Sequence, residues 1–478
     1  MYDDFPHRTF DNLDLSHFNH SKIDLENQDL LQKTWQLYKR SKLLKSSTWY
    51  MFSTFFERGL AFIGVLIFTR LLTKEEYGTV SLFLSWFSIF AATITLNSTA
   101  AIQLAKHDFD ENDYSSFVAS STILGLLAGV VALVILFELP ISFIDQVFNL
   151  NKVYVVLAAL AVILESPWKS VLLVWRVEYQ YKRYALTSIL ITTSKLSISV
   201  LLILLPVFLD DKAAARIYGI VFVSLLAGIY FLRWILLYSS NIVNWRMWRY
   251  TLSYSLPLIP HALTGFILSH FDRILIDRYI GREETGLYTF AYQLGEIVYM
   301  VWYASNTAWV PWFYEQMKRE NYELINKRST QYLLVFTLIV SLVILCAPLL
   351  VIIFASEEYR AAGIAVPIVM SGLFFYLPYS LHANIQFYRK RTFFISLGTA
   401  LAACINLLLN VWLLPEIGYI GAAWSTLVAY IFLYIFHMVI VRYILKSQVH
   451  LNETLMFILG VGVTLLSLLV YILMSADV

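Results

Sequence analysis

The stretch RLLTKEEYGTVSLFLSW, residues 70–86, recurs later in the chain as RYIGREETGLYTFAYQL, residues 278–294. The shared positions pair Arg70 with Arg278, Lys74 with Arg282, Glu75 and Glu76 with Glu283 and Glu284, and Gly78 with Gly286. A second echo relates IYGIVFVSLLAGIY, residues 217–230, to YIGAAWSTLVAYIF, residues 419–432. Chance similarity between apolar segments is the alternative explanation. Two echoes at nearly the same offset favour two copies of one structural unit.

The composition places both copies in a membrane. Of 478 residues, 59% are hydrophobic and 14% are Asp, Glu, Lys or Arg, against about 25% charged residues in a soluble domain. A chain with so few charges cannot cover a water-exposed surface, so we expect a polytopic membrane protein.

Apolar windows of about 20 residues predict thirteen transmembrane helices. They are expected at residues 47–70, 77–103, 117–138, 152–175, 184–209, 215–238, 251–277, 286–311, 330–354, 362–388, 392–414, 420–443 and 454–474. Six helices separate the two copies, so both start on the same side of the membrane, as a parallel repeat does. The predicted fold is an all-α polytopic membrane protein with two six-helix lobes and a 13th helix.

Loop charges orient the chain. Lys and Arg gather in the loops on the side of the N-terminus, for example at residues 39–45, 318–328 and 389–391, which predicts a cytoplasmic N-terminus. The predicted organisation is a cytoplasmic extension (1–45), an N-lobe (46–238), a cytoplasmic linker (239–250), a C-lobe (251–445) and an extra C-terminal helix (446–478).

The extension has two parts. Its first thirty residues are polar and acidic, which favours disorder. In LLQKTWQLYKRSKLLK, residues 30–45, Leu31, Trp35 and Tyr38 share a helical face beside basic residues. This pattern predicts an interfacial helix on anionic lipids, and a solvated basic extension of the first span explains it equally well.

The segment ILESPWKSVLLVW, residues 163–175, carries polar residues inside a predicted span. A charge at the bilayer centre costs at least about 2.5–3.5 kcal/mol and marks a candidate functional site. Glu165 and Lys169 have the i, i+4 spacing of a helical ion pair, and Pro167 leaves the carbonyl of Ile163 without its usual donor. We expect a bent, water-accessible face, although a pair that only locks neighbouring helices together is the alternative.

Four basic residues are candidate anion-binding residues, because Arg and Lys pair well with phosphates. They are Arg58, Lys169, Lys195 and Arg273. Lys195 has no acidic residue within one helical turn, so its partner must come from another helix or from a ligand. Arg273 lies near a helix end and could instead extend to the headgroups.

Five further residues are candidates for ion coupling or gating, namely Glu57, Glu165, Asp272, Glu296 and His261. A hydrogen-bonded structural histidine is the alternative for His261. The sequence contains no P-loop, zinc-ligand spacing or Ser-His-Asp motif, and the acidic run DFDENDY, residues 108–114, lacks the glycine of a calcium loop. We therefore expect no enzyme, no catalytic residues, no metal site and no cofactor; Na⁺ and H⁺ are the two candidate coupling ions.

Three segments carry a family resemblance. FTRLLTKEEYGTVSLF (68–83), FDRILIDRYIGREETGLYTFAYQL (271–294) and NLLLNVWLLPEIGYIGAAWSTLVAY (406–430) are similar to segments of bacterial polysaccharide flippases. These belong to the multidrug/oligosaccharidyl-lipid/polysaccharide exporter superfamily, and the resemblance covers about residues 46–445. It implies two six-helix lobes around a cationic cavity that opens alternately to each side.

The resemblance also implies a function. Such proteins move undecaprenyl-diphosphate-linked oligosaccharides from the cytoplasmic to the outer leaflet of the bacterial inner membrane. The expected partners are the lipid-linked oligosaccharide, anionic membrane lipids and other polysaccharide assembly proteins, and not nucleic acid. A multidrug or cation antiporter, a lipid II flippase and a polysaccharide polymerase or ligase are the alternatives. An unpaired Lys195 argues against a cation extruder, and short outer loops argue against an enzyme.

Overall fold

The computed structural model describes residues 42–239 and 241–476, and the side chains from Lys45 onward. The predicted interfacial helix at residues 30–45 lies largely outside them. The described residues form helices and connecting turns without strands. The first half comprises α2 (Lys42–Leu71), α3 (Lys74–Thr93), a 3₁₀ turn (Ser98–Ala101), α4 (Ile102–Asp108), α5 (Glu111–Glu138), α6 (Ile141–Phe148), α7 (Lys152–Val177), α8 (Tyr181–Ile203), a 3₁₀ turn (Pro206–Phe208) and α9 (Lys212–Leu237).

The second half begins after α10 (Trp245–Ser255) and a 3₁₀ turn (Leu256–Leu258). It comprises α11 (Ile259–Tyr279), α12 (Arg282–Lys318), α13 (Tyr322–Leu345), α14 (Ala347–Phe354), a 3₁₀ segment (Glu357–Ala365), α15 (Val366–Phe374), α16 (Tyr376–Tyr388), α17 (Thr392–Ile417), α18 (Ile420–Val439), a π-helical turn (Ile440–Ile444) and α19 (Glu453–Ala476).

Helices occupy the positions of all thirteen predicted spans. Within the described residues, ten helices are long and apolar enough to cross a membrane, and the bent pair formed by α3 with residues 98–108 makes an eleventh. Helices α11 and α12 are not in that set: they are less apolar than the ten, and they carry charged residues such as Asp272, Arg273, Glu284 and Glu296. The helix predicted at 454–474 is present as α19 and is among the ten.

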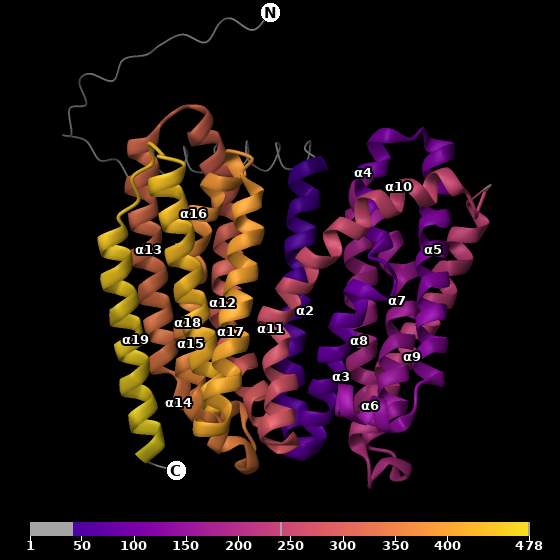
Figure 1. Ribbon diagram of the computed structural model, residues 1–478, viewed down its shortest axis with the longest axis horizontal. Helices are drawn as coiled ribbons and strands as arrows, with labels where there is room; N and C mark the ends of the chain where they lie inside the picture. Colours follow the sequence, from indigo (N-terminus) through magenta and orange to yellow (C-terminus); the bar gives the residue numbers. More distant parts are fainter. Residues whose placement is uncertain (1–41, 240, 477–478) are drawn as a thin grey trace, which may run out of the picture.

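The helices form two groups that stand side by side, with α2 and α11 between them (Figure 1). In one group α7 packs against α5 and α9, and α8 packs against α2 and α9. In the other, α18 packs against α17, α15 and α16. These groups correspond to the two halves of the sequence.

The largest contact between the groups is the crossing of α3 with α12. A Cβ atom on Gly78 would lie 2.0 Å from the carbonyl oxygen of Arg282, and one on Gly286 would lie 2.1 Å from that of Lys74. Glycine at both positions lets the two backbones approach closely. The contact is reciprocal, because Gly78 and Gly286 are the matching glycines of the sequence echo. Three residues further along, the hydroxyls of Ser81 and Thr289 are 2.6 Å apart.

Further bonds between the halves gather near this crossing, at the bottom of Figure 1. Thr69 donates to the carbonyl of Phe354 over 2.8 Å, and the hydroxyl of Tyr359 donates to the carbonyl of Thr73 over 2.9 Å. Lys74 and Glu283 form an ion pair at 2.8 Å. We call this region the Lys74 end.

At the end of the molecule opposite the Lys74 end, helix α11 is less buried. Along α11, His261 and Gly265 are exposed, whereas Leu268 and residues 272–277 are buried. The packing around α11 therefore loosens away from the Lys74 end.

Helix α10 includes the first residues of the span predicted at 251–277. The sequence predicts a span at 251–277, but the structure breaks it at Leu256–Leu258, where Pro257 removes a backbone donor. Helix α10 instead lies against the first half (Figure 1). The indole of Trp248 donates to the carbonyl of Ser120 over 2.9 Å, and the hydroxyls of Thr251 and Ser121 are 3.1 Å apart.

Candidate functional site

Glu165 is the centre of a charged cluster inside the first half. Its side chain, on α7, is 4% exposed and forms an ion pair with Lys169 at 2.7 Å. Lys195, on α8, forms a second ion pair with the same carboxylate. The hydroxyl of Ser224, on α9, lies 3.3 Å from Oε1 of Glu165. One carboxylate thus joins three helices and two ammonium groups.

The two lysines remain partly accessible. The side chain of Lys169 is 41% exposed and that of Lys195 is 21% exposed. Their ammonium groups lie 5.7 and 5.5 Å from the ring of Trp168. Two positive charges share one negative charge, so the cluster keeps an excess positive charge with free N–H donors.

Lys195 has its partner on another helix, which is one of the two sources that the sequence leaves open, so Lys195 no longer argues against a cation extruder. Its partner is Glu165, which is thirty residues away in sequence and on another helix. Sequence spacing identifies the Glu165–Lys169 pair but not a contact between helices. Pro167 is buried inside α7, which continues from Lys152 to Val177. The i, i+4 pairing expected of Glu165 and Lys169 is present in the structure.

Arg58 lies on α2, between the two halves. Its guanidinium carbon is 5.0 Å from the ring centres of both Tyr299 and Tyr303 on α12. Its Nε is buried and has no hydrogen-bond partner among the described residues. Adjacent Glu57 points elsewhere and accepts a hydrogen bond from Ser188 of α8. Glu57 and Arg58 therefore contact different helices.

An aromatic cluster supports the tyrosine next to Arg58. The rings of Tyr299, Trp302 and Tyr376 lie 4.9–5.1 Å from one another, centre to centre. The ring of Tyr430 lies 4.8 Å from that of Tyr376. Such rings can stack on sugars or cations.

Arg273 is 5% exposed and does not extend to the headgroups. Its guanidinium lies 4.3 Å from the ring of Tyr292 and donates to the carbonyl of Ser269. Glu296 lies within electrostatic reach of Arg273 and Arg58. The structure therefore brings Arg58 of α2, Arg273 of α11 and Glu296 of α12 into one region.

Asp272, next to Arg273 on α11, is fully buried, and the ring of its partner Tyr288 lies 5.7 Å from the Arg273 guanidinium. It accepts hydrogen bonds from the hydroxyl of Tyr288 at 2.7 Å, the amide of Asn410 at 3.0 Å and the hydroxyl of Thr426 at 3.1 Å. All three donors are neutral. The fifth coupling candidate, His261, is exposed and lies 3.4 Å from the hydroxyl of Ser396, so it joins neither cluster.

Sequence reasoning missed the neutral partners of these charges. Ser224, Ser188 and Thr426 are common in apolar helices and give no charge signal. Tyr299 and Tyr303 belong to an aromatic fraction of 16% spread along the chain. A spacing of four between Tyr299 and Tyr303 is the one sequence feature that would have placed both rings on one helical face.

The described residues contain no group of three or more His, Cys, Asp or Glu side chains that could hold a metal ion. The cluster at Glu165 consists of ion pairs, and the cluster at Asp272 consists of hydrogen bonds from neutral donors.

Comparison with known protein families shows to which family this chain belongs. The model of a family described as polysaccharide biosynthesis protein matches residues 43–317, which is more than half of the chain. The chain belongs to this polysaccharide biosynthesis protein family.

Two relatives of this family member come from Haemophilus influenzae. Protein 1 of the Lsg locus is 25% identical over 294 residues, which cover 58% of this chain and 68% of that protein. An uncharacterized membrane protein is 23% identical over 382 residues, which cover 76% of this chain and 89% of that protein.

Solved structures share the fold of this polysaccharide biosynthesis family member. The lipid II flippase MurJ in an inward closed conformation superposes with a TM-score of 0.66 at 14% identity, over 90% of this chain and 98% of that one. An inward-facing multidrug resistance MATE transporter of the MOP superfamily gives 0.59 at 15% identity, over 82% and 96%. The fold is therefore the one shared by this flippase and this transporter, as the sequence predicts.

Proposed function

We propose that this protein flips an undecaprenyl-diphosphate-linked oligosaccharide from the cytoplasmic to the outer leaflet by alternating access. The observation that carries the proposal is the sharing of Glu165 by Lys169 and Lys195. An excess positive charge inside a membrane protein needs a negative partner. A diphosphate supplies that charge together with several acceptor oxygens for lysine N–H groups.

The arrangement of the halves fits one state of such a cycle. With a cytoplasmic N-terminus, the Lys74 end faces outward. The crossing of α3 and α12 then closes the outer side, and the looser end of α11 faces the cytoplasm. This is the state that would load substrate from the inner leaflet.

The surface along α12 suits the lipid part of the substrate. An apolar hollow of about 720 Å³ lies between α2, α12 and α14, lined among others by Phe62, Met300 and Ser305. A second hollow of about 610 Å³ is lined by Ser305, Trp309 and Tyr332. The shared Ser305 makes them neighbours along α12, so a polyprenyl tail could stay in apolar surroundings while the diphosphate reaches the lysines.

Asp272 is the proposed coupling residue. A fully buried carboxylate with only neutral donors is costly as an anion, so a proton or a small cation would stabilise it. The Oδ1 atom of Asn410 is buried without a partner among the described residues. A flip of this amide would turn an oxygen toward the carboxylate. Asp272, Asn410 and Thr426 would then offer the oxygen ligands that Na⁺ prefers, and a proton is the alternative.

The test uses Lys195→Ala in the producing bacterium, with Lys195→Arg as the matched control that keeps the charge. We expect Lys195→Ala to reduce surface polysaccharide at least about tenfold at equal membrane levels, since a charge-assisted hydrogen bond is worth about 1.5–3 kcal/mol. The lipid-linked intermediate should accumulate on the inner leaflet.

Three outcomes would contradict the proposal. Normal export by the Lys195→Ala variant would remove the lysine from the site. Normal export by a strain that lacks the whole protein would reject the flippase itself. Accumulation of a peptidoglycan precursor in place of a polysaccharide intermediate would identify the alternative lipid II flippase.

A further inference from the structure

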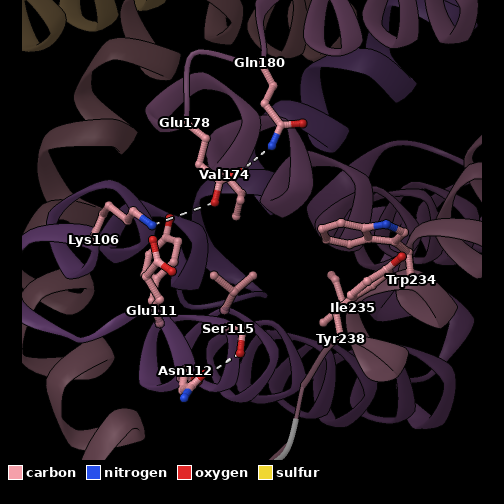
Figure 2. Close-up of a pocket in the computed structure, with 12 residues that line it drawn as sticks. Lys106, Glu111, Asn112, Ser115, Val174, Glu178, Gln180, Trp234, Ile235 and Tyr238 are labelled. Atoms are coloured by element: carbon pink, nitrogen blue, oxygen red, sulfur yellow. Dashed lines mark hydrogen bonds and ion pairs between the residues drawn. The ribbon is translucent and has the colours of Figure 1, made fainter.

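A polar hollow lies in the first half, at the end opposite the Lys74 end. It has a volume of about 360 Å³ and is formed where α4, α5, α7 and α9 begin or end. Figure 2 shows Lys106, Glu111 and Glu178 along one wall and Trp234, Ile235 and Tyr238 along the facing wall. It shares no residue with the clusters around Glu165, Arg58 and Asp272.

The charged wall carries both signs. The ammonium of Lys106 lies 4.7 Å from the ring centre of Tyr114 and 3.8 Å from Oε1 of Glu178. A distance of 3.8 Å exceeds that of a hydrogen bond, so Lys106 retains N–H donors for another acceptor. Glu178 also accepts from Gln180 over 2.6 Å. Glu111 forms no ion pair with another described residue.

Tyr114 adds an independent sign of a missing partner. It lines the hollow and is 3% exposed, and its hydroxyl is buried without a hydrogen-bond partner among the described residues. A buried hydroxyl usually finds a protein group, a water molecule or a ligand. An acceptor next to Lys106 would satisfy both groups at once.

The facing wall is aromatic. The rings of Trp234 and Tyr238 lie 4.8 Å apart, and Tyr238 is 67% exposed. Aromatic faces beside carboxylates are a preferred environment for an ammonium ion. The hollow therefore offers a phosphate position at Lys106 and Tyr114, and an ammonium position at Glu111, Glu178 and Trp234.

The position of the hollow at the ends of membrane-spanning helices indicates that such a ligand comes from the membrane. Helix α5 starts at Glu111 and α9 ends at Leu237, and both are among the membrane-spanning candidates. The hollow thus lies where spans meet the headgroup layer, a level at which Trp and Tyr are enriched. Below it, α5 and α9 expose apolar side chains such as Leu127, Val131 and Leu226.

We infer that this hollow binds the headgroup of a phospholipid that carries both a phosphate and a primary ammonium, as phosphatidylethanolamine does. Lys106 and the Tyr114 hydroxyl hold the phosphate, and Glu111 and Glu178 accept from the ammonium beside Trp234. A purely anionic headgroup would meet two carboxylates, and a purely cationic ligand would meet Lys106. The acyl chains lie along the exposed apolar faces of α5 and α9. This inference is independent of the proposed substrate.

The experiment is native mass spectrometry of the purified full-length protein in detergent. Equal amounts of phosphatidylethanolamine, phosphatidylcholine and phosphatidylglycerol are added, and bound lipids are counted. We expect about tenfold more phosphatidylethanolamine than phosphatidylglycerol. Phosphatidylcholine should bind less than phosphatidylethanolamine, because its quaternary ammonium has no N–H to donate.

Variants locate the site. Glu111→Gln combined with Trp234→Leu should remove the preference for phosphatidylethanolamine. The matched control, Glu315→Gln with Trp412→Leu, changes an exposed glutamate and an exposed tryptophan outside the hollow and should keep it. Equal retention of the three lipids by the wild type would overturn the inference whether or not the variants fold. An unchanged preference in the first double variant would also overturn it.

A competition arm separates a lipid from a free ligand. Soluble glycerophosphoethanolamine should displace phosphatidylethanolamine only at far higher concentration, because it lacks the apolar chains. Displacement at equal concentration would show that a soluble phosphoamine suffices and would reject the lipid assignment.

Discussion

Glu165 is the single negative charge between two lysines, and this excess of positive charge can be tested by measuring stability. In Glu165→Gln, two ammonium groups lose their counter-charge, and we expect the free energy of unfolding to fall by about 1–3 kcal/mol. The variant with Glu165→Gln and Lys195→Met removes one charge of each sign and should be more stable than Glu165→Gln alone. Thermal unfolding of the purified protein measures both.

Additive effects of the two substitutions would contradict this coupling, because residues in one ion-pair network give non-additive changes.

Asp272 carries the prediction on ion coupling. Asp272→Asn keeps the size of the side chain and can still accept from Tyr288 and Thr426, but it loses the negative charge. We expect the flipping rate to lose its dependence on a Na⁺ or H⁺ gradient. Flipping of a labelled lipid in proteoliposomes, with and without each gradient, measures this dependence.

If the Asp272→Asn variant responds to each gradient as the wild type does, Asp272 takes no part in the coupling mechanism. Thr264→Val is a suitable control, because its hydroxyl bonds only to the backbone of α11 at the exposed end.

At the scale of helices, the crossing of α3 and α12 depends on two glycines. A methyl group in Gly286→Ala would lie 2.1 Å from the carbonyl oxygen of Lys74, so α3 and α12 must separate. We expect the population closed at the Lys74 end to fall, with a cost of about 1–3 kcal/mol for the overpacked contact. Distances between spin labels on α3 and α12 measure the separation.

Gly462→Ala is the matched control, because a methyl group on Gly462 meets no atom within 4 Å. Unchanged distances in Gly286→Ala would show that the crossing tolerates the extra atom and does not set the conformation.

How far the sequence predicts these elements depends on the range of the interaction. Windows of apolar residues locate the spans, because lipid imposes length and hydropathy on each helix separately. The same windows merge α10 with α11, since they do not register that Trp248 and Thr251 bind the first half. For the site, helical spacing predicts the contact of Glu165 with Lys169. The contact with Lys195 depends on how α7 and α8 pack, which no local pattern encodes.

At the scale of the whole molecule, the orientation of the chain in the membrane can be tested. Glu357, near the Lys74 end, is 89% exposed, and Glu315, at the other end of α12, is 54% exposed. We expect an impermeant maleimide to label Glu357→Cys in intact cells, and Glu315→Cys only after permeabilisation. Cys346 and Cys404, both exposed, must first be replaced. The reverse labelling pattern would invert the orientation, and with it the proposed direction of loading.

The contact between Gly78 and Gly286 also concerns the evolutionary origin of the two halves. A residue that touches its own counterpart lies on a two-fold axis, as in a symmetric homodimer. The crossing therefore has the form of a subunit interface retained within one polypeptide, as if two copies of an ancestral half-length gene had fused. Contacts away from the axis are free to diverge after such a fusion. Lys74 pairs with Glu283, whereas Arg282, its counterpart, binds Asp277.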